Sequence, residues 1–285
     1  MAEKPAIVIV PPDPADINSF PSRKKLTRRS RIRPASIFHP EDPTLPPELH
    51  FPLQTVRAPD RPVHPRFVNR FNSREILLVV DGSCINNGRH ADKSSPPIGS
   101  ASFKFKNSPG IPNAAVTLPL TKDGNGGRRA ITGTIAFRLE EEGPRGDVMD
   151  HTSNRAKLRA VIAALQFRGW HGEGWRGVVV LTDLEYIVKG ATEWLPRWVE
   201  RRWRKSRARA GRGMGGRKYA NRDLWEELQH RIEELRSMGC EVSFWLVRDG
   251  ELIRQTKAAA RMAAWEGKEE GLPVEKYTRL FGIMM

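Results

Sequence analysis

The sequence predicts an α/β fold in which helices flank a mixed β-sheet. Two apolar runs, Glu75–Asp81 and Gly177–Thr182, each reach an aspartate at their end and are rich in β-branched residues. Such runs are typical of strands that are buried on both faces. Between them, Thr152–Leu165 repeats apolar residues at i, i+3, i+4 and i+7, which predicts a helix with one buried face. The repeated residues are Leu158, Val161, Ile162 and Leu165.

The remaining elements follow from alternation and helical periodicity. We expect Thr152 or Ser153 to cap the helix, because a hydroxyl there accepts from a free backbone N–H. Three antiparallel strands before that helix and a parallel strand after it indicate a mixed sheet with crossover connections. Further strands are predicted at Ser102–Lys106, Ala114–Leu118, Thr132–Arg138 and Glu241–Val247, and further helices at Asn221–Arg236, with Asn221 as a candidate cap, and at Leu252–Trp265.

Composition points to a polyanionic partner. The chain has 285 residues, 39% of them hydrophobic and 28% charged, with a net charge of +15. Such a charge favours nucleic acid first and an acidic membrane surface second, while a basic protein without such a partner stays open. No apolar run is long enough for a transmembrane helix, so no transmembrane span is expected, and the predicted partner is nucleic acid and not a membrane. The two cysteines lack zinc-site spacing and suit a reducing, intracellular compartment, with nucleus and cytoplasm both open.

The chain divides into three predicted parts. Residues 1–66 are rich in proline and basic residues and are expected to form a largely irregular arm that could contact protein partners. Within this arm, Arg23–Arg33 holds seven basic residues and no acid. A nuclear address, a phosphate-binding arm and a solvated charged run all remain open for it. Residues 67–266 form the predicted domain, and residues 267–285 form a tail.

A second basic region interleaves cations with tryptophans. Residues 197–218 hold ten Lys or Arg residues against one acid, and three tryptophans lie within or beside them. Guanidinium groups neutralise phosphates and indoles pack on sugars or bases, so this region predicts nucleic-acid contact. A solvated hairpin whose tryptophans pack in a small satellite core is the alternative. The candidate contacts are Trp194, Trp198, Arg201, Arg202, Trp203, Arg204, Lys205 and Arg207.

Four motifs in order resemble the type 1 ribonuclease H family. They are DGS at Asp81, TSNRAKL at the helix start, TDLEY at Asp183 and NRDLWEEL at Asn221, and the resemblance covers about residues 70–266. It implies a ribonuclease H-like α/β fold with a mixed five-stranded sheet. It also implies hydrolysis of RNA in RNA–DNA hybrids by two divalent ions, with Asp81 and Asp183 as ligands. Asn86, Asn87 and Asn154 would then contact the nucleic acid, and the basic region would match a protrusion that grips the DNA strand.

The chain departs from the family at two acidic positions. The third residue after Asn154 is a metal-binding glutamate in the family and is Lys157 here, and the family's fourth carboxylate aligns with Gln255 or Thr256. Two divalent ions about 4 Å apart need several clustered carboxylates. A lysine ammonium beside them would repel each unit of cation charge by several kcal/mol, at about 4 Å and an effective dielectric near 20. We therefore predict that Lys157 pairs with Asp81 and Asp183 in place of a metal.

Three functions remain open at this point. The first is a non-catalytic protein that binds RNA or RNA–DNA hybrids and needs no cofactor. The second is an active endoribonuclease that cleaves hybrids with Mg²⁺ or Mn²⁺ held by Asp81 and Asp183. The third is a structural interaction module in an RNA-containing assembly. Acids that could restore a metal site are Asp150, Glu185, Asp249 and Glu251.

Overall fold

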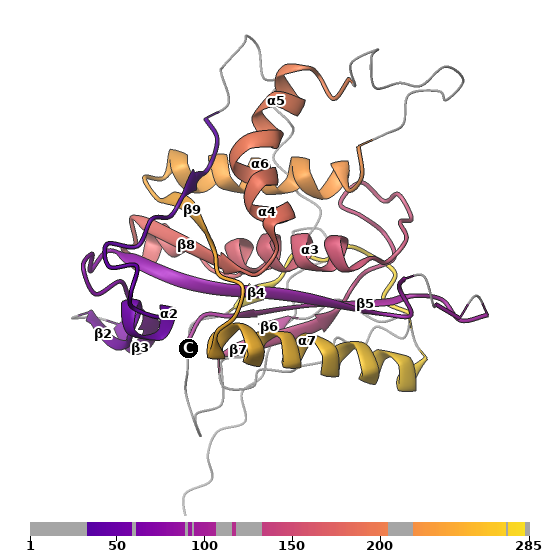
Figure 1. Cartoon of the computed structure of the whole chain (residues 1–285), viewed down its shortest axis with the longest axis horizontal. Helices are drawn as coiled ribbons and strands as arrows, with labels where there is room; N and C mark the ends of the chain where they lie inside the picture. The colour runs from indigo at the N-terminus through magenta and orange to yellow at the C-terminus, as the bar shows by residue number, and fades with distance from the viewer. Residues whose placement is uncertain are drawn as a thin grey trace, which may run out of the picture. The chain divides into compact units, whose positions relative to one another are not determined.

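A six-stranded mixed sheet organises the chain in the computed structural model (Figure 1). The structure describes residues 33–58, 61–88, 91–92, 94–106, 116–117, 133–204, 219–271 and 273–282. In spatial order the strands are β1 (Ser36–Ile37), β9 (Glu241–Leu246), β8 (Gly177–Thr182), β4 (Glu75–Ile85), β5 (Ile98–Lys104) and β7 (Thr134–Arg138). The strands β1, β9 and β8 run parallel to β4, whereas β5 is antiparallel to β4 and β7 is antiparallel to β5.

The sheet has one more strand than the five expected. The added strand is β1, which pairs in parallel with β9 and covers an edge that would otherwise present unpaired backbone groups. The described residues of the predicted strand Ala114–Leu118 do not join this sheet. They form β6 (Val116–Thr117), which pairs with β10 (Phe281–Gly282) in a separate two-stranded sheet.

Residues 33–66 differ from the irregular arm expected there. They contain β1, the short helix α2 (Pro47–His50), and a hairpin of β2 (Leu53–Ala58) and β3 (Arg61–Phe67). Proline at the first position of α2 suits a helix start, because the missing N–H has no intrahelical partner there. Aromatic side chains, among them Phe38 and Phe51, bury this segment against Trp245 of β9. Residues 1–32 lie outside the described part, and with them most of the basic run.

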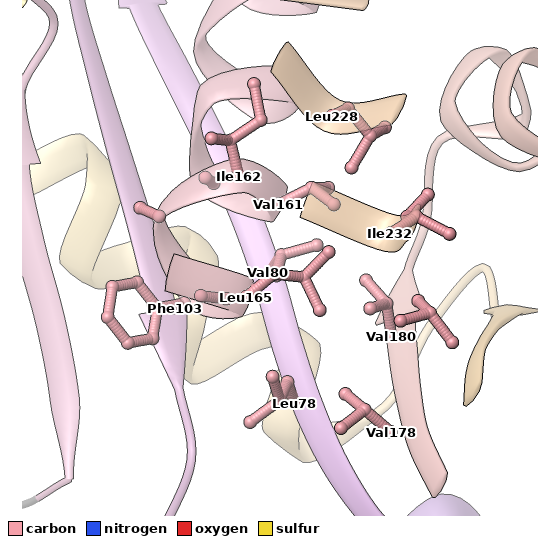
Figure 2. Close-up of a cluster of buried hydrophobic side chains, with 14 of the residues drawn as sticks. Leu78, Val80, Phe103, Val161, Ile162, Leu165, Val178, Val180, Leu228 and Ile232 are labelled. Carbon is pink, nitrogen blue, oxygen red and sulfur yellow. The ribbon is translucent and has the colours of Figure 1, made fainter. Parts of the chain in front are cut away.

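Alternating side chains of β4 separate two cores. Ile76, Leu78 and Val80 join a large cluster under α3 (Ser153–Gln166) and α6 (Arg222–Ser237). Figure 2 shows Leu78 and Val80 in this cluster. Leu77 and Val79 point the other way, into a cluster with Leu252 and Ile253 of α7 (Glu251–Glu270). The helices therefore cover both faces of the sheet, as buried β4 and β8 require (Figure 1).

The start of α3 is set by local chemistry and by one glycine. The Thr152 hydroxyl accepts from the Arg155 N–H at 3.1 Å, so the expected cap is present. A Cβ at Gly82 would lie 2.5 Å from backbone atoms of Ala156 and Lys157. Glycine there lets the first turns of α3 lie directly against β4. By contrast, Asn221 precedes α6 in a left-handed conformation, with φ 54°, and its side chain does not cap the helix.

The segment after β8 forms a continuous series of helical turns. It consists of α4 (Glu185–Lys189), a π-helical stretch at Gly190–Trp194 and α5 (Leu195–Glu200). A Cβ at Gly190 would lie 2.1 Å from the ring of Trp225 on α6, so glycine is needed for the two helices to meet. A shorter 3-10 helix at Trp170–Glu173 links α3 to β8. In the described ranges, no helix combines the length and apolar character that crossing a membrane requires.

Buried ion pairs attach α3 to its neighbours. Arg155 donates both terminal nitrogens to Asp223 of α6, at 3.0 and 2.7 Å, and both side chains are buried. Arg159 forms a second buried pair with Glu140, at 2.7 Å, and its guanidinium lies 4.4 Å from the Tyr277 ring centroid. A buried charge without its partner is costly, so these pairs fix the position of α3.

We predict that Asp223→Asn lowers the free energy of unfolding by about 3 kcal/mol or more, because it leaves Arg155 buried without a counter-charge. Chemical denaturation measures this change. The matched control is Asp249→Asn, which removes an exposed partner of Arg254 and should change the free energy by less than about 1 kcal/mol. Equal effects of the two substitutions would contradict the assignment of a stabilising role to the Arg155–Asp223 pair.

Candidate functional site

Four charged side chains from four elements meet where β8 ends beside the middle of β4. The strand β4 continues to Ile85, beyond the end expected at Asp81. Asp81 lies on β4, and Asp183 directly follows β8, the parallel neighbour of β4. Lys157 comes from the second turn of α3 and Lys257 from the second turn of α7. The site therefore depends on helices from both faces of the sheet. We call Asp81, Lys157, Asp183 and Lys257 the charge cluster.

Lys157 lies between the two aspartates. Its Nζ is 2.9 Å from Oδ1 of Asp81 and also donates to Oδ1 of Asp183. Lys257 approaches from the other side, with its Nζ 2.8 Å from Oδ2 of Asp183. Each oxygen of Asp183 thus accepts from a different ammonium group. Because two carboxylates meet two ammonium groups, the cluster carries no net charge.

The cluster is most buried at Asp81 and opens toward Lys257. The Asp81 side chain is fully buried and that of Lys157 is 10% exposed, whereas that of Lys257 is 45% exposed. Oδ1 of Asp81 also accepts from the Gly82 N–H at 2.6 Å. Oδ2 of Asp81 is buried and has no hydrogen-bond partner. Lys157 is therefore the main compensation for a carboxylate that has lost its water.

The surroundings shift the pKa values of Asp81 and Asp183 in opposite directions. Burial raises the pKa of Asp81, and the nearby charge of Lys157 opposes this shift without cancelling it. Burial also raises the pKa of Asp183, but hydrogen bonds from Lys157 and Lys257 outweigh it, so its pKa lies below the ordinary value. The same hydrogen bond to Asp183 raises the pKa of Lys257. Asp183 is thus held ionised between two cations.

These residues do not fit a divalent cation. An ion that bridged Asp81 and Asp183 would need the place that the Lys157 ammonium takes, because Lys157 contacts an oxygen of each. Lys257 adds a second positive charge on the remaining oxygen of Asp183. Within the described ranges, no group of three His, Cys, Asp or Glu residues is placed to hold a metal. Carboxylates already neutralised by ammonium groups have little affinity left for Mg²⁺.

The acids considered as replacements point elsewhere. Glu185 pairs with Lys189 on the surface of α4, and Asp150 is exposed. Asp249 and Glu251 both pair with Arg254, at 2.9 and 3.1 Å. Glu185, Asp249 and Glu251 thus pair with exposed cations outside the charge cluster.

Lys257 is not among the site residues predicted from the sequence. Of the two residues aligned with the family's fourth carboxylate, Gln255 accepts from Lys104 at 2.9 Å, and Thr256 is buried, with its hydroxyl donating to Leu252. The residue of α7 that reaches Asp183 is the next one, Lys257. The available signal was a lysine in the second turn of the last helix. Its register depends on packing of α7 against the sheet, which periodicity does not specify.

The three candidate asparagines differ in their surroundings. The Asn86 amide donates to the carbonyls of Asp92 and Ser95, and its oxygen accepts from the Asp92 N–H, so the side chain closes its own loop. Asn87 donates to the Ser153 hydroxyl at 3.5 Å, which places it beside the start of α3. Asn154, in the first turn of α3, is exposed. Asn87 and Asn154 therefore lie near one another, while Asn86 is engaged within the loop.

The tryptophans of the basic region pack in an aromatic cluster. The Trp198 ring lies 5.9 Å from Trp194, 5.7 Å from Trp203 and 5.6 Å from the buried Trp225. The half-buried indoles pack against one another and against the large core under α3 and α6. The arginines beside them stay exposed, namely Arg201, Arg202 and Arg204. Lys205 and Arg207 lie outside the described residues.

We predict that Lys157→Met lowers the free energy of unfolding by about 3 kcal/mol or more at pH 7, because it removes the cation next to buried Asp81. Urea denaturation measures this loss. The control is Lys189→Met, which breaks the exposed pair with Glu185 and should cost less than about 1 kcal/mol. A Lys157→Met variant as stable as the parent chain would show that Lys157 does not stabilise the two aspartates.

Similarity to known proteins was found at the level of sequence and structure. Residues 120–241 match the family model described as RNase H. The chain is 33% identical over 115 residues to "Ribonuclease H" of Xanthomonas oryzae pv. oryzae, covering 39% of this chain and 69% of that protein. It is 39% identical over 77 residues to "Ribonuclease H" of Cyanothece sp., covering 27% of this chain and 43% of that protein. A solved structure of LC9-RNase H1, described as a type 1 RNase H with the type 2 active-site motif, aligns with a TM-score of 0.40 and 26% identity over 67% of this chain and 72% of the other.

Proposed function

The chain belongs to the ribonuclease H family, and we propose that it binds RNA or RNA–DNA hybrids without cleaving them. The observation that carries this proposal is the Lys157 ammonium between the carboxylates of Asp81 and Asp183. In the family resemblance these two aspartates are metal ligands. Here the chain's own cations satisfy them, and the cluster has no net negative charge to attract divalent ions.

Positive charge around the domain supports the binding half of the proposal. The chain carries a net charge of +15, and Arg201, Arg202 and Arg204 are exposed at the end of α5. Packed indoles beneath them hold this segment against α6, as the contact of Trp198 with Trp225 indicates. Exposed guanidinium groups on a fixed support can neutralise phosphates. Such binding requires no metal bridge between the protein and the nucleic acid.

A second candidate is an active hybrid ribonuclease. The curated relatives are named ribonuclease H, which favours this activity for a chain of the same family. For this chain it would require Lys157 to leave Asp81 and Asp183 and other oxygen ligands to replace it. Breaking contacts to a fully buried aspartate opposes that rearrangement.

We predict that the full chain binds a labelled RNA–DNA hybrid equally well with EDTA and with Mg²⁺, and that it does not cleave the hybrid when Mn²⁺ is added. Fluorescence anisotropy measures binding, and gel electrophoresis measures cleavage. Affinity should fall steeply with salt, because phosphate contacts release counterions. Cleavage that disappears in an Asp183→Asn variant would refute the non-catalytic assignment and establish the hydrolase. Absence of binding to every nucleic acid tested would refute the binding assignment.

A variant that replaces both cations tests the role of charge directly. Lys157→Glu combined with Lys257→Asp changes the cluster from no net charge to four carboxylates, which is a set that divalent ions prefer. We predict that Mn²⁺ raises the melting temperature of this variant and leaves that of the parent chain unchanged. Isothermal titration gives the affinity. An equal effect of Mn²⁺ on both proteins would show that Lys157 and Lys257 do not control metal binding.

A further inference from the structure

Helix α7 presents a cationic and aromatic stripe on its outer face. Lys257, Arg261, Trp265 and Lys268 are all exposed and follow one another at i, i+4, i+8 and i+11. Residues at these spacings share one side of a helix. Buried residues of α7 beside this stripe, such as Ile253, Ala260 and Ala264, pack on the sheet. We call the four exposed residues the α7 stripe.

Trp265 differs from the other tryptophans of the chain. Seven of the eight are buried or half-buried, either in the two cores or in the aromatic cluster beside α5. Trp265 is 51% exposed, and its neighbour Met262 is 60% exposed. The ammonium of Lys268 lies 5.1 Å from the Trp265 ring centroid. The Trp265 indole is therefore about half in water, with one ammonium group, that of Lys268, over its ring.

The cations of α7 differ in how far neighbouring carboxylates neutralise them. At the start of α7, Arg254 is neutralised by Asp249 and Glu251. Lys257 donates to Asp183, but an ammonium group has three N–H donors, and this side chain is 45% exposed. Arg261 follows one turn later and is exposed. The middle of the helix thus offers donors to an anionic ligand directly beside the exposed indole.

We propose that the α7 stripe binds an extended single strand of nucleic acid, with phosphates on Lys257 and Arg261 and a base stacked on Trp265. Cations that follow the backbone and an aromatic platform for a base are the combination that single strands require. This surface lies on the face of the sheet opposite to α3 and α6, so it is separate from the exposed arginines at the end of α5 (Figure 1). The inference rests on the proposed nucleic-acid binding and adds a second contact surface to it.

Substitutions on α7 separate the base contact from the phosphate contact. The full chain is titrated with a fluorescent oligouridylate over a range of salt concentrations. Trp265→Ala is expected to weaken binding by about tenfold with little change in the salt dependence, because it removes one stacked base. Arg261→Ala is expected to reduce the slope of log affinity against log salt by about 1, because it removes one phosphate contact. Arg254→Ala is the matched control on the same helix and should leave both quantities unchanged.

The outcomes distinguish failure of this surface from failure of the function. If the parent chain binds the oligonucleotide and Trp265→Ala and Arg261→Ala bind equally well, the α7 stripe is refuted and nucleic-acid binding stands. If the parent chain binds no nucleic acid, both proposals fall. Poly-glutamate serves as an acidic competitor. If it displaces the oligonucleotide and Trp265→Ala weakens its binding as much as RNA binding, the stripe recognises an acidic protein and the inference is refuted. Thermal melting verifies that each exposed substitution leaves the fold intact.

Discussion

The contact of Lys157 with Asp81 and Asp183 is the interaction on which the rest of the site depends. Asp81 is fully buried on the central strand, where an uncompensated carboxylate would be strongly unfavourable. Lys157 supplies the opposite charge from α3, and Lys257 adds a second cation from α7. The cluster therefore connects the two helical layers where β8 ends beside β4. It stabilises the same arrangement that leaves no room for a bridging metal ion.

Helix α3 has this role because several of its charged residues point inward. Arg155, Lys157 and Arg159 are buried, and each pairs with a carboxylate from a different part of the chain. The helix also carries the apolar residues that pack under α6. Ion pairs so placed give specificity of position, since a shift of α3 would leave three cations without partners. The close approach permitted by Gly82 completes this arrangement.

The N-terminal segment contributes to the site from a distance. Glu48 of α2 accepts from the Leu252 N–H at 3.0 Å, which satisfies a free donor at the start of α7. Glycine precedes that helix and provides no side-chain cap. Residues 33–67 thus help fix the beginning of the helix that carries Lys257 and the α7 stripe. The proline-rich composition of this part gave no indication of such packing, because β1 pairs with β9 and Glu48 bonds to α7, two segments far away in the sequence.

Local pattern in the sequence determined the α/β class, the positions of α3, β8 and α6, and the meeting of Asp81, Lys157 and Asp183 beside the end of β8. Apolar periodicity and parallel strand order suffice for these, because they depend on neighbouring residues and on which edge a strand ends. Tertiary structure decided that Lys257 completes the cluster, that β1 extends the sheet, and that Asn86 closes its own loop. The contacts of Lys257 and β1 depend on how segments far apart in the chain pack, and the Lys257 contact also depends on the rotation of α7 about its axis. The Asn86 contacts depend on the path of its loop, which hydrophobic periodicity does not specify.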